Sequence, residues 1–292
     1  MTIRTIDGLH AAQRDDIADL VTRRPVPGPH LDQVDPFLFL NHHGPQVYQP
    51  NNSGLPFGPH PHRGFETVTF ILDGSLAHRD SAGHESVIEA GGVQWMTAGS
   101  GLVHAELSPA AFKKEGGRLE LLQLWVNLPS RLKMTEPRYT GVQFDHIPGV
   151  PIADGKGVLN LISGSFEGRI GPIPSLTGVF MSTVRLSAGG VVALPAPRER
   201  SVFLYVVSGE VTVSGTAVKP WNLVRMNDDG DAIPTEARTD AVLLFGHGDP
   251  IGEPVVAHGP FVMNTDEEIA VAIRDYRAGT FARAGRLGEV GR

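Results

Sequence analysis

The chain has 292 residues, of which 41% are hydrophobic and none is cysteine, and its formal net charge is −7 at neutral pH. The lack of cysteine excludes disulfides, cysteine-held zinc and thiol catalysis, so any transition metal must be held by histidine and carboxylate. Basic residues cluster only in isolated pairs such as Arg23-Arg24, so we expect no direct nucleic-acid binding, which depends on neutralising phosphates.

The first residues, MTIRTIDGLHAAQRDD, contain no apolar core of the kind that a signal peptide needs. No apolar run along the chain approaches the roughly eighteen residues of a membrane-spanning helix. We therefore expect no membrane segment and, by default, a cytoplasmic protein. The lack of cysteine fits a reducing compartment without proving one.

Short runs rich in Val, Phe, Leu and Thr are separated by the abundant glycines (35) and prolines (23). Such short strands, bounded by turn residues at regular spacing, predict an all-β sandwich or barrel rather than βαβ units. In chain order the clearest predicted strands are FETVTFIL (65–72), ESVIEA (85–90), LLQLWVNL (121–128), SVFLYVV (201–207) and AVLLFG (241–246).

Two segments share one arrangement, which indicates an internal duplication. Residues 58–80 and 193–215 each consist of a proline-spaced entry, an apolar strand, a tight turn ending in glycine and a second strand. A repeat this long predicts two domains rather than a solenoid. We expect a metal-binding domain over 1–135 and a second domain over 136–292, with the loop-rich stretch 128–157 as the linker.

Helix is scarce in the predicted structure. The best candidate is NTDEEIAVAIRDYRAG (264–279), which has Asn264 as a potential N-cap, acidic residues in the first turn and Gly279 as a stop. We expect this short C-terminal helix to pack against the body of the fold.

The strongest chemical signal comes from two pairs of residues with i, i+2 spacing. His60 and His62 flank a proline, and His104 and Glu106 follow a glycine-rich turn. In an extended segment, residues i and i+2 point to the same face. The two pairs together predict one divalent metal ion held by three histidines and one glutamate. The alternative is that His60 and His62 only cap loops and that His104 is a hydrogen-bonded core residue.

A ligand set of three nitrogens and one oxygen suits Fe(II), Mn, Ni, Cu or Zn. If the ion is octahedral, about two coordination positions are open, whereas a structural zinc site would be closed and tetrahedral. Open positions would let O₂ and a chelating enol or phenol bind side by side.

This spacing resembles the two motifs of the cupin superfamily. The usual glutamate of the first motif falls at Thr67, so Glu66 is one residue out of register, and a one-residue slip turns a side chain to the other face of a strand. Glu106 is therefore the better carboxylate ligand, although Glu66 stays open as a metal contact. The matching positions are Gly54, His60, His62, Glu66, Gly74, Gly101 and His104, with Gly99 and Ser108 departing from the second motif.

A closer resemblance, to the pirin family, covers nearly the whole chain. It is carried by DPFLFLNHHGP (35–45), PHPHRGFETVTFILDG (59–74), AGGVQWMTAGSGLVHAE (90–106) and EPVVAHGPFVMNTDEEIAVAIRDY (253–276). The resemblance implies an all-β fold of two tandem cupin (jelly-roll) barrels, with iron bound in the N-terminal barrel. It also implies a C-terminal barrel without metal, in keeping with Pro195 and Pro197 at the positions that match the two histidines.

The resemblance further implies a quercetin 2,3-dioxygenase-like activity. On this hypothesis a flavonol or similar enolisable aromatic binds with O₂, and Glu106 is the candidate base for its 3-hydroxyl group. The alternative, which the resemblance also implies, is a non-catalytic regulator whose metal or redox state tunes binding to a protein partner, as a transcriptional co-regulator or a modulator of a metabolic enzyme. An apolar cavity opening onto the metal would favour the enzyme. Because both barrels lie in one chain, we expect a monomer.

Several other residues have less specific interpretations. His42 and His43 could line the mouth of the metal site or only form loop hydrogen bonds. A group of phenylalanines could form an apolar pocket wall or ordinary core, and Trp95 and Met96 are expected in the core. The phenylalanines are Phe37, Phe39, Phe57 and Phe65, and the histidines expected at the surface or in loops are His78, His84, His146, His247 and His258.

Overall fold

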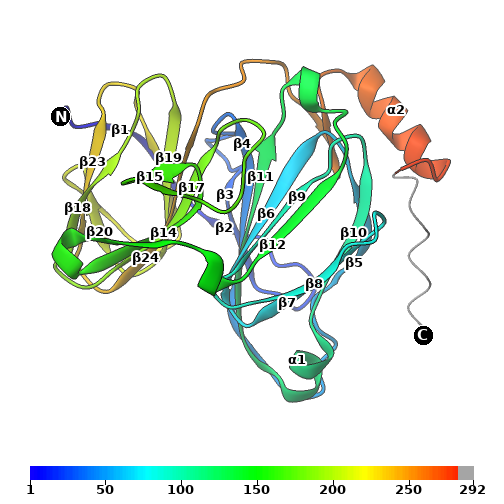
Figure 1. Ribbon diagram of the computed structural model, residues 1–292, viewed down its shortest axis with the longest axis horizontal. Helices are drawn as coiled ribbons and strands as arrows, with labels where there is room; N and C mark the ends of the chain where they lie inside the picture. The colour runs from blue at the N-terminus through cyan, green and yellow to red at the C-terminus, as the bar shows by residue number, and fades with distance from the viewer. Residues whose placement is uncertain (282–292) are drawn as a thin grey trace. The chain divides into compact units, whose positions relative to one another are not determined.

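The computed structural model describes residues 1–281, and the short apolar runs fold as strands where the sequence predicts them (Figure 1). Each predicted strand is confirmed, with no end displaced by more than four residues. The five are β6 (Phe65–Asp73), β8 (Glu85–Glu89), β11 (Gly117–Asn127), β19 (Ser201–Ser208) and β24 (Ala241–Gly248).

The chain divides into two compact units that we name by the bulk of their residues. The N-terminal barrel consists of Asp16–Thr22, His42–Phe144 and the described residues from Ile251 on. The C-terminal barrel consists of Met1–Asp15, Arg23–Asn41 and Asp145–Pro250.

This division differs from the expected one, 1–135 and 136–292, because each terminus folds with the other half of the chain. Strand β1 (Ile6–Ala11) pairs with β22 (Asn222–Met226) of the C-terminal barrel. The C-terminal residues instead meet the N-terminal barrel, where Phe261 bridges to Arg63. Residues 282–292 of the expected second domain lie outside the described residues.

The predicted linker contains more regular structure than expected. Strand β12 (Arg138–Val142) pairs with β9 (Val93–Thr97), and β13 (Gly149–Ile152) pairs with β14 (Gly157–Ser163). These two strands each form the edge of a sheet, and the boundary between the units falls between them, after Phe144.

Two sheets build the N-terminal barrel, and β5 and β10 face β6 and β9 across its interior (Figure 1). Their strand orders are β5-β10-β7-β8 and β12-β9-β6-β11-β4-β3-β2. In the second sheet, β2, most of β3 and the first residues of β4 are among those counted with the C-terminal barrel. The strands not yet given are β2 (Gln13–Arg14), β3 (Thr22–Val26), β4 (Phe37–Tyr48), β5 (Phe57–His62), β7 (Ser75–Asp80) and β10 (Leu102–Leu107), and a short helix α1 (Ala110–Glu115) precedes β11.

Two further sheets, with orders β1-β22-β19-β24-β17-β14-β13 and β18-β23-β20-β21, build the C-terminal barrel. Its core is formed by alternate residues of the central strands, among them Val202, Leu204 and Phe245, all fully buried. The remaining strands are β15 (Ser165–Phe166), β16 (Arg169–Ile170), β17 (Phe180–Leu186), β18 (Val191–Pro195), β20 (Val211–Val213), β21 (Thr216–Val218) and β23 (Ala232–Ala237).

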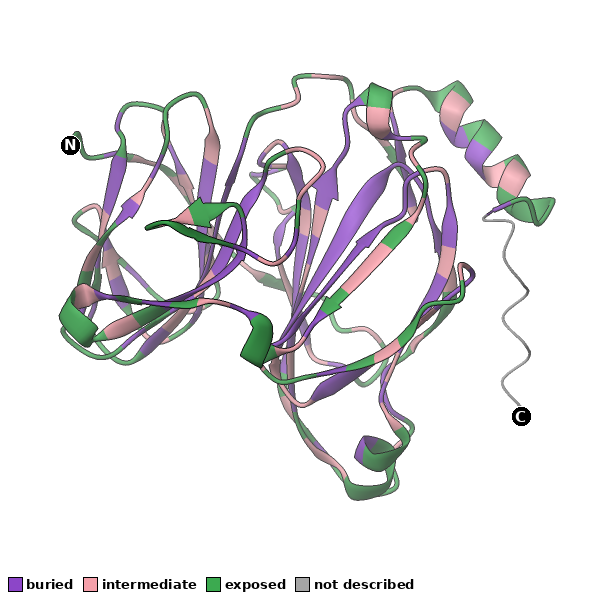
Figure 2. Cartoon of the chain, viewed as in Figure 1, coloured by how far each residue is buried: buried purple, intermediate pink, exposed green. Residues whose placement is uncertain are grey.

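The inward faces of β6 and β19 differ in polarity, although their sequences align on the turn glycines Gly74 and Gly209. Where β19 has Val202 and Leu204, β6 has Thr67 and Thr69, and both threonines are buried. Figure 2 shows β6 buried along most of its length. Buried hydroxyls need hydrogen-bond partners, so the N-terminal barrel has a polar interior where the C-terminal barrel has an apolar core.

The C-terminal helix is confirmed, but its N-cap is Thr265 and not Asn264. Helix α2 (Asp266–Arg277) begins with a capping box in which Thr265 accepts from the backbone N–H of Glu268, and the Glu268 side chain accepts from the N–H of Thr265. The backbone N–H of Asn264 donates to the same carboxylate. Gly279, at φ +68°, follows the helix as predicted.

A two-stranded ribbon of β25 (Val256–His258) and β26 (Phe261–Met263) precedes this helix. Ile269 and Ala272 form the buried side of α2. Within residues 1–281, no helix has the length and apolarity needed to cross a membrane.

Substituting the hairpin glycines of the C-terminal barrel tests the close approach at one turn. Gly209 and Gly215 both have positive φ, but a Cβ at Gly209 would lie 2.2 Å from the Asp240 carbonyl oxygen, whereas Gly215 faces open space. We predict that Gly215→Ala costs about 1–2 kcal/mol, the penalty of the left-handed conformation, and that Gly209→Ala costs more. The midpoints of urea unfolding measure both, and equal effects would contradict the steric argument.

Candidate metal centre

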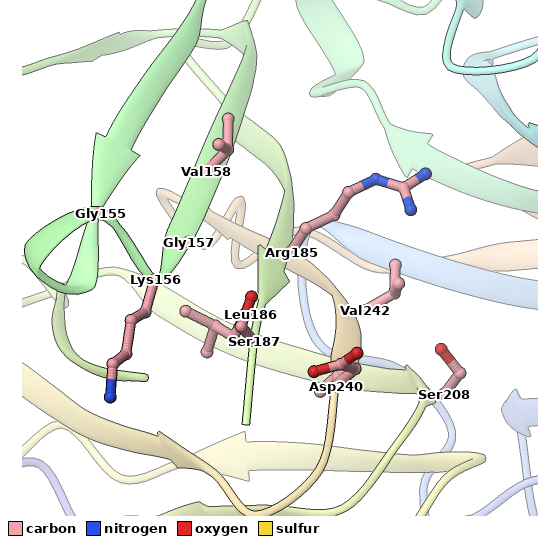
Figure 3. Close-up of a pocket in the computed structure, with 11 residues that line it drawn as sticks. Gly155, Lys156, Gly157, Val158, Arg185, Leu186, Ser187, Ser208, Asp240 and Val242 are labelled. Atoms are coloured by element: carbon pink, nitrogen blue, oxygen red, sulfur yellow. The ribbon is translucent and has the colours of Figure 1, made fainter. Parts of the chain in front are cut away.

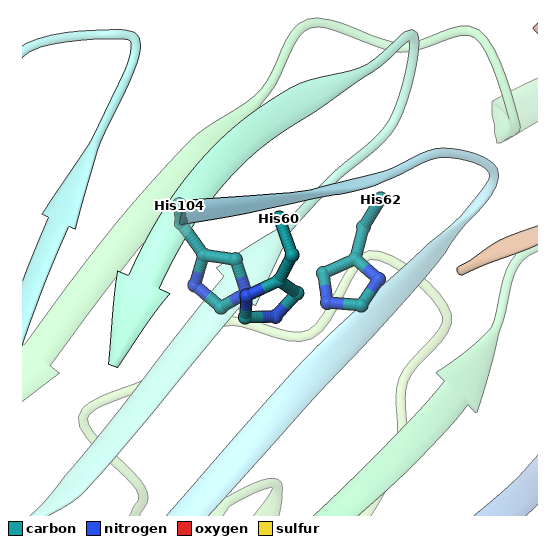
Figure 4. Close-up of side chains that lie close together, drawn as sticks. All are labelled: His60, His62 and His104. Carbon is teal, nitrogen blue, oxygen red and sulfur yellow. The ribbon is translucent and has the colours of Figure 1, made fainter. Parts of the chain in front are cut away.

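Three histidines meet inside the N-terminal barrel because of the register between β5 and β10. His104 lies directly opposite His60 in this antiparallel pair, and His62 follows two residues on along β5. Figure 4 shows the three rings converging. One nitrogen from each ring can be chosen so that all three lie within 4.8 Å of one another. The i, i+2 geometry predicted for His60 and His62 therefore delivers both rings to one point with His104.

Hydrogen bonds fix the orientation of two of the rings. Nδ1–H of His60 donates to the Gly58 carbonyl at 2.7 Å, and Nδ1–H of His62 donates to the Pro260 carbonyl at 3.3 Å. When the proton is held on Nδ1, the Nε2 lone pair is left for a metal ion. Both rings are thus held in the tautomer that a metal ligand needs.

The third histidine has an unfilled hydrogen-bonding capacity. His104 is 1% exposed, and neither of its ring nitrogens has a hydrogen-bond partner among the described residues. Buried polar atoms are nearly always paired in folded proteins. An ion bound between the rings would satisfy one of these two nitrogens, so the donor set fits a divalent metal.

The electrostatics of the cluster keep its buried rings neutral. Burial, together with the nearby His60, lowers the pKa of His62 to about 3, against the opposing hydrogen bond to Pro260. Burial also lowers the pKa of His104 well below its ordinary value, with His62 and His60 adding to the effect. Neutral imidazole is the form that binds metal, so these two ligands would not have to lose a proton first.

Glu106, the predicted fourth ligand, is buried close by but does not join the cluster of three. Its Oε1 accepts from Thr69 Oγ1 at 2.9 Å and its Oε2 accepts from Gln123 Nε2 at 2.7 Å. The register shift between β10 and β5 lies in β5, where three residues separate Phe57 from His60 against two in β10. Because β10 pairs regularly with β7, Glu106 stays on the same face of β10 as His104. Its role as a ligand stays a prediction.

Glu66 belongs to a different environment. Because strand residues alternate between faces, Glu66 points away from the face on which Thr69 meets Glu106. Its Oε1 accepts from Thr97 Oγ1 at 2.6 Å. Burial raises the pKa of this carboxyl to about 7, against the opposing hydrogen bonds from Thr97 and Trp95.

Sequence reasoning missed a polar chain beside the cluster. His78, expected at the surface or in a loop, is 2% exposed, and its ring lies 5.4 Å from that of His104 and stacks on Tyr139 at 3.9 Å. Asp80 joins His78 Nε2 to His84 Nδ1 at 2.9 and 3.0 Å. The i, i+2 spacing of His78 and Asp80 on one strand was the available signal.

Asp80 is held as a carboxylate within this chain. Burial would raise its pKa, but hydrogen bonds from His78 and from the backbone N–H of His84 outweigh burial and hold the pKa below its usual range. His84, by contrast, is 43% exposed at its side chain, so its surface prediction holds.

The other residues singled out from the sequence have mostly structural roles. His42 bonds to Glu120 and His43 to Thr22, so both form the hydrogen bonds of the less specific interpretation. Trp95 and Met96 are core residues, as predicted. His146 and His258 are exposed as predicted, whereas His247, expected at the surface or in a loop, is buried and stacks on Phe180.

The four phenylalanines do not form one pocket wall. Phe65 packs against His62, with ring centroids 5.2 Å apart, and against Trp125 at 4.4 Å. Phe57 packs against His43, whereas Phe37 and Phe39 belong to the C-terminal barrel.

Two cavities described in the structure lie in the C-terminal barrel, and neither is lined by the three histidines. The first, of about 360 Å³, lies at the ends of β14, β17 and β24. Figure 3 shows that the charged ends of Lys156 and Arg185 point away from each other there. The second, of about 550 Å³, is lined by residues between Ser163 and Val179.

Comparison with known proteins identifies the family. The Pirin family model matches residues 19–126, and the model of the Pirin C-terminal cupin domain matches residues 181–282. The chain belongs to the pirin family. A pirin-like protein from Caulobacter vibrioides is 42% identical over 255 residues, covering 87% of this chain and 90% of that protein. Pirin from Homo sapiens is 37% identical over 284 residues, covering 94% and 91%.

A solved structure supports the fold expected for the pirin family. The crystal structure of a quercetin 2,3-dioxygenase from Acinetobacter baumannii matches with a TM-score of 0.89 at 31% sequence identity, covering 96% of this chain and 99% of that one. Together with the two family models, this match confirms the predicted all-β fold of two cupin barrels with a short C-terminal helix.

Acid should destabilise the metal-free protein through its buried histidines. In the unfolded chain the His62 ring takes up a proton near pH 6.5, whereas in the folded chain it does so only near pH 3. The stabilisation is therefore complete above about pH 6.5 and is lost as the pH falls towards 3. We predict that His62→Gln flattens the decline in unfolding free energy between pH 6.5 and 4, measured by urea unfolding.

The exposed His146 provides the control for this measurement. His146→Gln should leave the pH dependence of the wild type unchanged. If His62→Gln and the wild type decline in parallel, burial does not hold the His62 ring neutral.

Proposed function

We propose that this pirin-family chain is a metal-dependent dioxygenase that opens a flavonol such as quercetin with O₂, with Fe(II) as the preferred ion. The observation that carries the proposal is the convergence of three imidazoles, two of them orientated by hydrogen bonds, beside the buried carboxylate of Glu106. The relatedness to a structure described as a quercetin 2,3-dioxygenase, at 31% identity, supports the substrate class.

The residues present fit a divalent transition-metal ion. His60, His62 and His104 would hold it, with Glu106 as the fourth ligand. Three nitrogen donors and one oxygen donor suit Fe(II), and Mn, Ni, Cu or Zn could also be held. When bound, the ion would supply Lewis acidity for the substrate oxyanion and a place to bring O₂ against it.

Glu106 is the candidate base for the flavonol 3-hydroxyl group. Its carboxylate accepts hydrogen bonds from Thr69 and Gln123, which hold it in one position beside the histidines. Taking up the 3-hydroxyl proton would leave the electron-rich enolate that reacts with O₂. Both atoms of O₂ would enter the product, on the two ring carbons that flank the carbon bearing the 3-hydroxyl group. As the ring opens, that carbon would leave as carbon monoxide.

Aromatic side chains on the inner face of the barrel would exclude water from the reaction. Phe65 and Trp125 pack against His62 with centroid distances of 5.2 and 5.5 Å. A dry site strengthens the interaction between the carboxylate and the hydroxyl group that it deprotonates.

A second function is favoured by the burial of the cluster. His62 and His104 are 4% and 1% exposed, which suits an ion that is retained rather than approached by a bulky substrate. The alternative is a metal- or redox-sensing regulator that binds a protein partner. A cytoplasmic location and a monomeric state are predictions that accompany either function.

Oxygen uptake by the iron-loaded protein separates the two functions. After anaerobic reconstitution with Fe(II), we predict quercetin-dependent O₂ uptake with release of carbon monoxide. His62→Ala should lose both bound iron and turnover, and Glu106→Gln should lower kcat by about 100-fold or more, the usual contribution of a general base.

The buried His247 of the C-terminal barrel supplies the matched control, because His247→Ala removes a buried imidazole outside the cluster and should keep iron and turnover. Stoichiometric iron without turnover in the wild type would contradict the dioxygenase and support the regulator.

A further inference from the structure

The C-terminal residues pack onto both strands that carry the histidine cluster. We call residues 253–281 the C-terminal clasp; it comprises β25, β26 and α2. Its buried side chains form a small apolar cluster, and Val103, the neighbour of His104 on β10, packs against it. A Cβ at Gly101 would lie 2.9 Å from the Phe281 ring, which places the end of the clasp against the turn that leads into β10.

Arg63, the residue after His62, ties the clasp to the end of β5. Its Nη1 lies 2.8 Å from the carboxylate of Asp275 on α2, and its guanidinium lies 4.4 Å from the centre of the Phe281 ring. Its Nε donates to the Ser100 carbonyl at 2.7 Å, and its own carbonyl accepts from the N–H of Val262 at 3.1 Å. Because the Arg63 side chain is only 5% exposed, loss of its partner would leave a buried charge unpaired.

Lys133 makes a second attachment at Gly64, the residue after Arg63. Its ammonium group donates to the carbonyls of Gly64 and Val262 and to Asn127 Oδ1, at 2.7–3.1 Å. The two backbones approach so closely that a Cβ at Gly64 would lie 2.0 Å from the Val262 carbonyl oxygen. These contacts therefore hold the clasp close to the end of β5.

Between these attachments the clasp contacts a proposed metal ligand directly. The Pro260 carbonyl accepts the Nδ1–H of His62 at 3.3 Å. This bond orientates the ring and keeps its Nε2 free. Pro260 lies in the turn between β25 and β26. The docking of this ribbon therefore sets the position of the Pro260 carbonyl.

We propose that the C-terminal clasp positions a ligand of the metal centre. The Pro260 carbonyl orientates the His62 ring, and the Arg63–Asp275 ion pair holds Pro260 in place. This inference rests on the proposed metal centre and adds a regulatory consequence. Partners that orientate metal-bound histidines commonly contribute 10- to 100-fold in affinity. Since coupling between two binding events is reciprocal, a bound ion would also hold the clasp closed.

The test uses Co(II) as a spectroscopic probe with the full-length protein. We expect Asp275→Asn to weaken Co(II) binding by about 10-fold, measured by competition with a chelator. Asp73→Asn is the matched control, because Asp73 also pairs with an arginine in this barrel, Arg118, at 2.7 Å. Asp275 and Asp73 are similarly exposed, 37% and 39%, but Arg118, the partner of Asp73, is 66% exposed. Loss of the Asp73–Arg118 pair should therefore leave Co(II) affinity unchanged.

Hydrogen exchange of the wild type tests the reciprocal effect without any substitution. Co(II) should slow exchange of the Val262 amide, which bonds to Arg63, and leave the C-terminal barrel amide of Val224 unchanged. Co(II) binding that is equal in Asp275→Asn and wild type, with no added protection of Val262, would overturn the clasp and leave the metal centre standing. Failure to bind Co(II) at all would overturn both.

Discussion

The rest of the site depends on the antiparallel register between β5 and β10, which puts His104 directly across from His60. A shift of one residue would turn His104 to the other face of its strand, and His60 and His62 would then face a different partner. The register is supported from outside as well as inside the barrel. The clasp packs on Val103, and Arg63 bonds to the Ser100 carbonyl.

The two barrels have different interiors, and the difference lies in a few inward positions. Thr67 and Thr69 stand where the C-terminal barrel has Val202 and Leu204, and His60 and His62 stand where it has Pro195 and Pro197. A carboxylate can be buried at Glu106 because Thr69 and Gln123 satisfy both of its oxygens. An unpaired charge there would be costly, which is why the polar site and its polar surroundings occur together.

Much of this could be predicted from the sequence because the signals were local. The i, i+2 spacing placed His60 and His62 on one face, and the turn glycines Gly74 and Gly209 fixed the alignment of the two halves. Other features depend on contacts distant in the chain. Each terminus folds with the other half of the chain, and the hydrogen bond that His62 donates to the Pro260 carbonyl joins residues 198 positions apart. Neither feature leaves a local pattern in the sequence. His78 was misplaced because its burial depends on Tyr139, which comes from a stretch predicted as linker.

Glu106 marks the limit of the spacing argument. The sequence places it on the same face of β10 as His104, but its two oxygens accept hydrogen bonds from Thr69 and Gln123, and the cluster consists of the three histidines alone. The central claim is that the three rings hold one ion, and anomalous diffraction from crystals of the Fe(II)-loaded protein tests it most directly. The account predicts one iron peak within bonding distance of a nitrogen of each of His60, His62 and His104, with a Glu106 oxygen completing the set. A peak elsewhere, or none between the rings, would contradict it.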